Sequence, residues 1–387
     1  MPKTYQRATQ NYWVKPLTFA TPFLYGESLT SWLVRAALEH GSSPLSFTYY
    51  YWPQYRIWTY DADKGFNHFD EQITSDIAVL TGHNVDTFDD QILIDFSEDT
   101  SIKSDNKTPL LWTKPLSKRN RYSRLGYPYC PDCMSDDKEA YLKLQWRFTW
   151  SVCCTKHKTF LQVDCAHCNQ PYQPQMLSPE QRYINRCHSC LGKMDKAILD
   201  ITPSEALNDF QQLADQAFLS KQGVVLGQVV SMAQWFEYLL FLINLVRRGL
   251  QNPNYMFGKL LTALELDTSD LSLPKTALRF DYLPIEERTA LLECAYHLLQ
   301  IDGDEWIKAC TVLNITQNSF QWSKYTVIPK AFTQVYDQLP LMPSRRHKAQ
   351  SENTQPTSPK AVMAAWNRLK RKMQMRESYD KHIKKDA

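Results

Sequence analysis

Eight of the ten cysteines lie between residues 130 and 190, and seven of them form, with one histidine, four pairs of closely spaced ligands. Two ligands separated by two residues can fill two corners of a tetrahedron from one tight turn, so two such turns complete the four-coordinate shell that zinc prefers. The pairs are Cys130 and Cys133, Cys154 and His157, Cys165 and Cys168, and Cys187 and Cys190. The spacing predicts two structural Zn²⁺ ions.

The shortest partition of these ligands makes each site local in the sequence. It places Cys130, Cys133, Cys154 and His157 in the first site and Cys165, Cys168, Cys187 and Cys190 in the second. In the second site 18 residues separate the two CxxC pairs, which fits a zinc-ribbon spacing. Cys153 is an alternative ligand for the first site because it directly precedes Cys154, and His167 and His188 lie within the turns of the second.

Two other uses of these cysteines are less compatible with the sequence. The chain begins with polar residues and lacks an apolar segment typical of a secretory signal, so we expect a reducing bacterial cytoplasm, where thiols bind metal in preference to forming disulfides. A catalytic zinc keeps one open position and usually mixes histidine with carboxylate ligands. Closed, sulfur-rich sites instead predict scaffolding, which contributes about 10–16 kcal/mol to folding a small module.

Composition and length place the chain among ordinary globular proteins. Its 387 residues allow two or three domains, with 43% hydrophobic and 22% charged residues. The most apolar stretch, residues 229–250, carries Gln234, Glu237 and Asn244 and ends near two arginines. Such polar residues are costly in a bilayer, so we expect a buried helix and no membrane partner.

The charge is divided unevenly along the chain. Residues 344–387 hold 12 Lys and Arg against 4 Asp and Glu, whereas residues 1–343 hold 32 against 37. A basic appendage on an acidic body is typical of an arm that binds phosphate or an acidic partner, although a solvated surface has the same composition.

Near the N-terminus, residues 28–40 have apolar side chains at helical spacing, with Ser28 and Gly41 as expected caps. Ser43 and Pro44 open a second helical segment, so residues 28–51 predict a helix-turn-helix whose second helix would face a major groove, or an ordinary helical hairpin. Seven of the residues from 49 to 60 are aromatic with one arginine among them, which favours packing or a protein interface over nucleic-acid stacking.

A basic cluster precedes the first cysteine pair. It consists of Lys114, Lys118, Arg119, Arg121 and Arg124, with no acidic residue among them. Cations attached to a metal-stiffened element would be well placed for a phosphate backbone, and a lysine-rich linker is the alternative.

The residues after 200 have helical patterns. We predict helices over 204–221, 228–250 and 284–300 in an all-α domain. Within it, Trp306, Ala309, Cys310 and Leu313 mark one apolar face, Asn314 a turn, and Thr316 the cap of a following helix, which together predict a second helix-turn-helix.

The tail contains a linker over 345–358 and a helix that begins at Ser358 and Pro359. The apolar side of this helix carries Val362, Met363, Trp366, Leu369 and Met373. The basic residues around the rest of it include Arg368, Lys370, Arg371 and Lys372. Such a helix can dock its stripe on a partner and present charge to nucleic acid, or pack on its own chain.

These patterns predict a mainly α, multidomain chain. Its parts are an N-terminal helix-turn-helix domain (1–120), a central zinc finger or ribbon module with two sites (121–200), an all-α domain (201–343), and a basic linker with a C-terminal helix (344–387). The chain has no GxGxxG, Walker A, GxSxG or HExxH motif, and no carboxylate lies in a motif that marks it as catalytic, although the members of an acidic triad can be far apart in a sequence. We therefore predict no catalytic residues and no enzyme.

The order of motifs resembles the TniQ/TnsD family of transposon target-selection proteins. The resemblance rests on Gly26-Glu-Ser-Leu-Thr-Ser-Trp-Leu-Val-Arg35, Tyr129-Cys-Pro-Asp-Cys133, Trp150, Cys154-Thr-Lys-His157, Leu161 and Cys165-Ala-His-Cys168, and it covers roughly residues 20–195. Lys158 departs from the family pattern, which often has glycine there, and Cys153 is an additional cysteine.

The resemblance implies a non-enzymatic adaptor that links target recognition to a TnsC-like AAA+ transposition regulator. Some members of the family read an attachment site in target DNA directly, and others act with an RNA-guided effector such as Cascade and its guide RNA. The length of this chain favours the CRISPR-associated kind. The alternative is a sequence-specific DNA-binding protein, an attachment-site reader or a regulator, that acts without such an effector. A homodimer is compatible with both.

Overall fold

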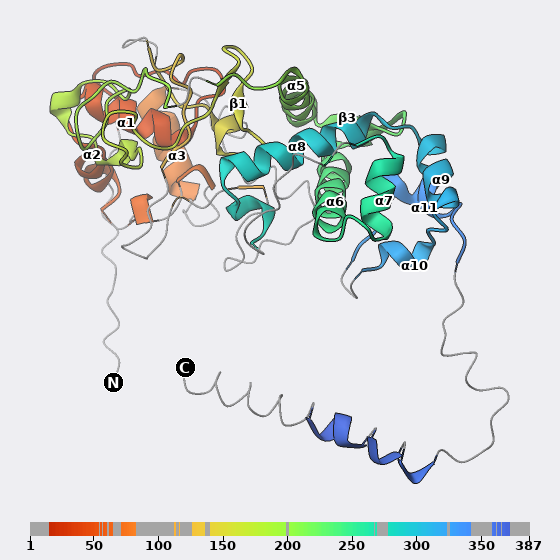
Figure 1. Cartoon of the computed structure of the whole chain (residues 1–387). Coiled ribbons are helices and arrows are strands. Elements are labelled where there is room, and N and C mark those ends of the chain that lie inside the picture. Colours follow the sequence, from red (N-terminus) through yellow and green to blue (C-terminus); the bar gives the residue numbers. More distant parts are fainter. Residues whose placement is uncertain are drawn as a thin grey trace. The chain divides into compact units, whose positions relative to one another are not determined.

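Helix α1 (Leu29–Glu39), labelled in Figure 1, has the expected N-cap, Ser28, whereas its C-cap is His40 and the expected Gly41 directly follows it. The Ser28 side chain accepts a hydrogen bond from the Ser31 amide, and Gly41 has a φ of +64°, a left-handed conformation that costs glycine little. Helix α2 (Pro44–Tyr51) follows, capped by Ser43, so both predicted N-terminal helices form.

The computed structural model describes most of the chain, with gaps that include the first 14 residues. The described residues are 15–53, 55, 57–59, 62–64, 71–82, 112–113, 116, 126–135, 140–198, 201–266, 268, 278–322, 326–341, 358–360, 362–364 and 366–371. They divide into two compact units, one up to Pro340 and one from Leu341. The predicted divisions near residues 120 and 200, within the first unit, stay predictions.

A small core joins α1, α2 and α3 (Glu71–Thr81) with the 3-10 turns η1 (Ile57–Thr59) and η2 (Ala62–Lys64). Trp32 and Trp52 are fully buried in this core, and the Trp52 indole N–H donates a hydrogen bond to the Asp76 carboxylate of α3 over 3.0 Å. Much of the aromatic run therefore serves packing, while Tyr49 and Tyr50 remain exposed on α2.

The middle of the first unit contains little regular structure. Strands β1 (Cys153–Cys154) and β2 (Thr159–Phe160) form a two-residue antiparallel ladder. Short 3-10 turns complete the segment: η5 (Leu144–Arg147), η6 (Pro174–Met176) and η7 (Pro179–Gln181). A region with so few backbone ladders depends on other interactions to hold its shape.

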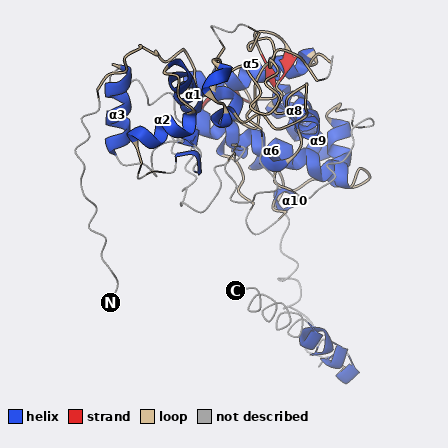
Figure 2. Ribbon diagram, turned by 90° about the vertical axis from the view of Figure 1, so that its left-hand side faces the viewer, coloured by secondary structure: helices blue, strands red, loops and turns tan. Residues whose placement is uncertain are grey.

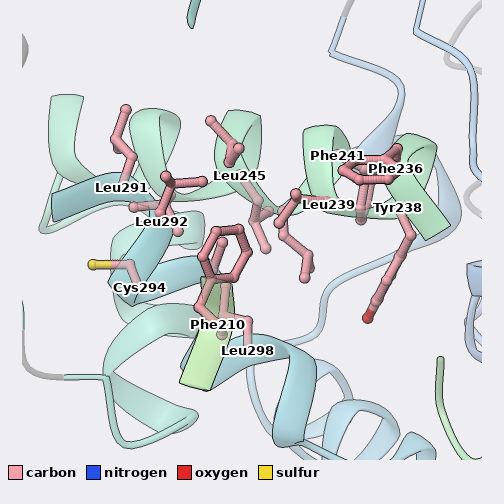
Figure 3. Packing of buried hydrophobic residues seen from close by; sticks show 14 of the residues in the cluster. Phe210, Phe236, Tyr238, Leu239, Phe241, Leu245, Leu291, Leu292, Cys294 and Leu298 are labelled. Atoms are coloured by element: carbon pink, nitrogen blue, oxygen red, sulfur yellow. The ribbon is translucent and has the colours of Figure 1, made fainter. Parts of the chain in front are cut away.

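The largest core lies among the later helices. Helix α6 (Met232–Gln251) packs against α5 (Glu205–Ser220), α7 (Met256–Ala263) and α8 (Ile285–Gln300). In Figure 3, Phe210, Leu239, Leu245, Leu292 and Leu298 from these helices lie together. None of the described helices combines the length and the apolar character that a membrane crossing requires.

The prediction of a helix over 228–250 is wrong at its start. Residues 222–231 form the hairpin of β3 (Gln222–Val225) and β4 (Gln228–Ser231), and α6 begins only at Met232, where Ser231 and Gln234 form a capping box. Leu226 and Gly227 at the turn both have positive φ, as a two-residue hairpin requires. The domain is therefore mainly but not entirely α-helical.

The second predicted helix-turn-helix is present only in a shortened form. Helix α9 (Gly303–Val312) is followed by Asn314 in the left-handed conformation and by Thr316 as the cap of α10 (Gln317–Phe320). One turn of helix is too short to place several side chains in a groove. The remaining short elements are η8 (Phe280–Tyr282), η9 (Lys330–Phe332) and α11 (Thr333–Tyr336).

The prediction of a mainly α, multidomain chain is confirmed. Among the described residues, strands occur only in the two short hairpins (Figure 2). In the second unit, the described residues between 359 and 371 are helical.

Candidate metal centres

The first quartet joins a turn at Cys130 and Cys133 to the β1–β2 hairpin, which carries Cys154 and His157. The four ligand atoms lie within 4.8 Å of one another. The Cys133 and Cys154 sulfurs are 3.8 Å apart, and the His157 Nδ1 lies 3.3 to 3.8 Å from the three sulfurs. The structure therefore brings together the four residues that the spacing assigned to one site.

The second quartet comprises the ligands that the sequence placed in the ribbon-like site. Its four sulfurs also lie within 4.8 Å of one another. Cys165 and Cys190 are 3.7 Å apart, and so are Cys168 and Cys187. Each contact joins one CxxC turn to the other, as a shared ion requires.

These distances fit a tetrahedral ion. A zinc–sulfur bond of about 2.3 Å gives an edge of about 3.8 Å between two sulfurs, and a zinc–nitrogen bond of about 2.0 Å shortens a mixed edge to about 3.5 Å. The sulfur–sulfur distances of 3.7 to 3.8 Å match such an edge. Free thiols would gain little from such close packing, so both quartets can hold a metal ion.

All four turns have a similar backbone geometry. The amide that follows each second ligand donates to the carbonyl of the first ligand, over 2.7 to 3.1 Å. In three turns this following residue is left-handed: Lys158, Asn169 and Leu191 have φ between 53° and 63°. In the second quartet the amides of His167 and Ser189 also approach ligand sulfurs at 3.4 Å, which stabilises thiolate charge.

The left-handed φ of Lys158 is a conformation that favours glycine at this position. A left-handed backbone costs a residue with a Cβ about 1–2 kcal/mol, and glycine avoids that cost. We therefore expect Lys158→Gly to raise the free energy of unfolding by about 0.5–1 kcal/mol, measured by urea denaturation of the metal-loaded protein. Lys156→Gly, whose backbone is not left-handed, should lower it. Equal effects of the two substitutions would contradict this assignment.

Cys153 is separated from the first quartet by strand alternation. Neighbouring residues of a strand point to opposite faces, and in β1 Cys154 faces the quartet while Cys153 packs into the core of the later helices. Its sulfur lies 3.8 Å from the Asn208 side chain. Burial raises the pKa of the thiols of Cys153, Cys294 and Cys310 to about 12, so these three are inert apolar side chains.

The two histidines inside the second pair of turns are not part of the quartet. The His167 Nε2 lies 3.0 Å from the Lys193 carbonyl oxygen, and the ring closely contacts Gly192. A Cβ at Gly192 would lie 2.6 Å from the His167 ring, so the close approach requires glycine there. His167, in the Cys165–Cys168 turn, thus packs against the residues that follow the Cys187–Cys190 turn. His188 is half-buried.

A buried polar network ties α1 to the segment before the first hairpin. The Glu27 carboxylate accepts from the Ser31 hydroxyl over 2.7 Å and from Arg35 over 2.6 Å. The Ser31 hydroxyl in turn accepts from the Leu142 amide over 2.9 Å. Burial raises the pKa of Glu27, while Arg35 opposes that shift. The Glu, Ser and Arg of the N-terminal motif therefore hold one helix face against residues 140–144.

A second buried group centres on Asp63. Its carboxylate accepts from the Thr30 amide over 2.7 Å and from the Tyr127 hydroxyl over 2.8 Å, and it pairs with Arg147. The side chains of Asp63 and Arg147 are fully buried. Arg147 also lies over the Tyr127 ring, 5.2 Å from its centre. Four distant parts of the sequence therefore meet at one ion pair, and one of them, Tyr127, lies three residues before Cys130.

Most of the predicted basic contacts lie outside the described residues. These are Lys114, Lys118, Arg119, Arg121, Arg124 and Lys372. Arg368, Lys370 and Arg371 lie on the exposed helix of the second unit. Their roles in binding DNA or a partner stay predictions.

The TniQ family model matches residues 19–161 of the chain. The match begins before α1, contains the complete first quartet and both buried networks, and ends before the second quartet. A comparison with curated proteins found no significant match. The first quartet and the motif that holds α1 are thus features of one recognised domain. Residues 19–161 are therefore similar to the TniQ domain, and the match covers this part of the chain alone.

Proposed function

We propose that this protein is a target-selection adaptor in DNA transposition. It would link a target-recognition complex, of the RNA-guided Cascade type, or target DNA itself, to a TnsC-like AAA+ regulator. The observation that carries the proposal is the TniQ domain over residues 19–161, because this family is associated with target selection in transposition. Adaptor function assigns no chemical step to the protein.

The metal in both quartets is proposed to be zinc. The donor sets are three sulfurs with one imidazole nitrogen, and four sulfurs, which are typical of structural zinc. Protein atoms supply all four corners of each tetrahedron, so neither quartet offers a position for a reacting water. The ions would stiffen the segment between α1 and α5 and keep its surfaces in fixed relation.

The composition of α2 favours target recognition through a partner complex over direct reading of bases. Bases in the major groove are read mainly by Arg, Lys, Asn, Gln, Asp and Glu. Helix α2, which would be the recognition helix, has none of these residues and instead exposes Leu45, Tyr49 and Tyr50. Aromatic and leucine side chains without charge suit a protein contact better than a groove.

Deleting the gene tests the adaptor proposal. We expect insertions at the programmed target to fall to the background level, while the transposase still joins ends on a permissive substrate. Sequencing of insertion sites measures targeting, and a strand-transfer assay measures end joining by the transposase. The Cys310→Ala variant, which loses a buried sulfur far from either quartet, should restore targeting, whereas Cys130→Ser should not. Unchanged targeting in the deletion strain would exclude the proposal.

A further inference from the structure

The helix of the second unit exposes an apolar stripe. Val362, Met363, Trp366 and Leu369 are 50 to 63% exposed, although each is a type of side chain that the first unit buries in its helices. In α6, for comparison, the twelve buried residues include Trp235, Leu239 and Leu245 at 3% exposure or less. Large apolar side chains gathered on one stripe are typical of a protein-interaction surface.

The spacing of the stripe is that of a helix-packing seam. Val362, Trp366 and Leu369 stand at i, i+4 and i+7, and these positions lie on one side of a helix. Anchors with this spacing are typical of a helix that lies in a groove of a partner protein. Phosphate contacts would use only the basic side of the helix and leave Trp366 and Leu369 in water.

The charge around the stripe has one sign. Residues 358–376 contain six Lys and Arg and no Asp or Glu. Arg368, Lys370 and Arg371 of this set are exposed on the described helix. Two copies of the helix packed side by side would bring like charges together, which disfavours a second copy as the occupant. Carboxylates at the rim of the groove would instead complement the helix.

We propose that the described helical residues between 359 and 371 belong to a docking helix, which binds a groove with an apolar floor and an acidic rim on a partner protein. Trp366 and Leu369 are the anchors, and Arg368, Lys370 and Arg371 contact the rim. The proposal rests on the proposed function in one respect, since the TnsC-like AAA+ regulator of that function is the partner that would carry the groove.

The test uses the full-length protein and the purified AAA+ regulator with ATP, and it measures the dissociation constant by titration calorimetry. Truncating both anchors, Trp366→Ala with Leu369→Ala, should weaken binding about 30-fold or more, as loss of buried anchors does. Lys370→Glu with Arg371→Glu should weaken it about 10-fold at low salt and less at high salt, because exposed charges are screened. Asn367→Ala, an exposed position beside Trp366, is the matched control and should change binding less than twofold.

Each other result counts against the docking helix. If the anchor variant binds the regulator as tightly as the wild type does, the docking helix is wrong. The adaptor function is still supported in that case if targeted insertion depends on the protein. Loss of affinity for a random 30-base-pair duplex, with regulator binding intact, would assign the helix to DNA. A lower mass of the anchor variant in sedimentation would assign it to self-association. A wild-type protein that does not bind the regulator overturns both this inference and the proposed link to that partner.

Discussion

Replacing Cys165 with serine should release the metal ion of the second quartet and unfold the metal-binding segment, which the structure describes over residues 126–135 and 140–198. Ligands of both quartets, Cys130, Cys154, Cys165 and Cys187, belong to one buried cluster, so opening one site exposes the core that both share. Among the described residues 126–135 and 140–198, regular structure is limited to a two-residue ladder, isolated β-bridges and short turns, and a structural zinc contributes about 10–16 kcal/mol to such a module. Metal content by mass spectrometry should fall from two ions to one or none, because the first quartet shares the exposed core, and calorimetry should show loss of a cooperative transition.

The Cys310→Ala variant is the control for this experiment. Cys310 is as buried as Cys165, but it lies in the core of the later helices and belongs to no quartet. Its replacement should keep both ions and cost about 1 kcal/mol, the usual effect of a small cavity. A Cys165→Ser protein that keeps two ions and melts like the wild type would show that the quartet does not hold metal.

The ligand quartets could be predicted from the sequence because each depends on short spacings. Two ligands on one turn are already neighbours, and the nearest two turns close each site. The choice between Cys153 and Cys154 was open because both adjoin the same turn. The β1 ladder settles it, since only one of two consecutive residues in a strand can face the ion.

The β3–β4 hairpin was not predictable from its turn residues. A two-residue hairpin with positive φ at both positions usually has Asn-Gly or Asp-Gly, whereas this chain has Leu226 and Gly227. The apolar residues Val229 and Val230 then extend the helical pattern of α6 towards the N-terminus. Tertiary packing of Gly223 against Trp235, where a Cβ would lie 2.4 Å from the ring, fixes the hairpin.

The buried networks were only partly open to prediction. Glu27, Ser31 and Arg35 recur every four residues, and this spacing alone could indicate a shared helix face. Asp63 is 64 residues from Tyr127 and 84 residues from Arg147 along the chain, so no local sequence pattern connects the three. Their meeting is a property of the fold, which only the three-dimensional structure shows.

Removing the Asp63 carboxylate should be the most damaging substitution outside the metal ligands. Asp63→Ala removes the carboxylate that pairs with the buried Arg147 guanidinium, and breaking a buried ion pair in this way costs about 3–5 kcal/mol. The Thr30 amide at the start of α1 and the Tyr127 hydroxyl lose an acceptor as well. Urea denaturation of the metal-loaded protein should show the loss, with metal content unchanged.

Two further variants separate the ion pair from a general effect of charge. Asp63→Ala combined with Arg147→Met removes both charges, and it should recover a large part of the loss because no buried charge is left unpaired. Asp195→Ala breaks a surface ion pair, in which the Lys193 Nζ and the Asp195 carboxylate are 3.9 Å apart and the two side chains are 28 and 30% exposed. Its loss should cost less than about 1 kcal/mol. If Asp63→Ala costs no more than Asp195→Ala, the Asp63–Arg147 pair does not hold α1 to the metal-binding segment. If the double variant is as unstable as Asp63→Ala, the lost acceptor for Thr30 and Tyr127, and not the unpaired charge, is the main cost.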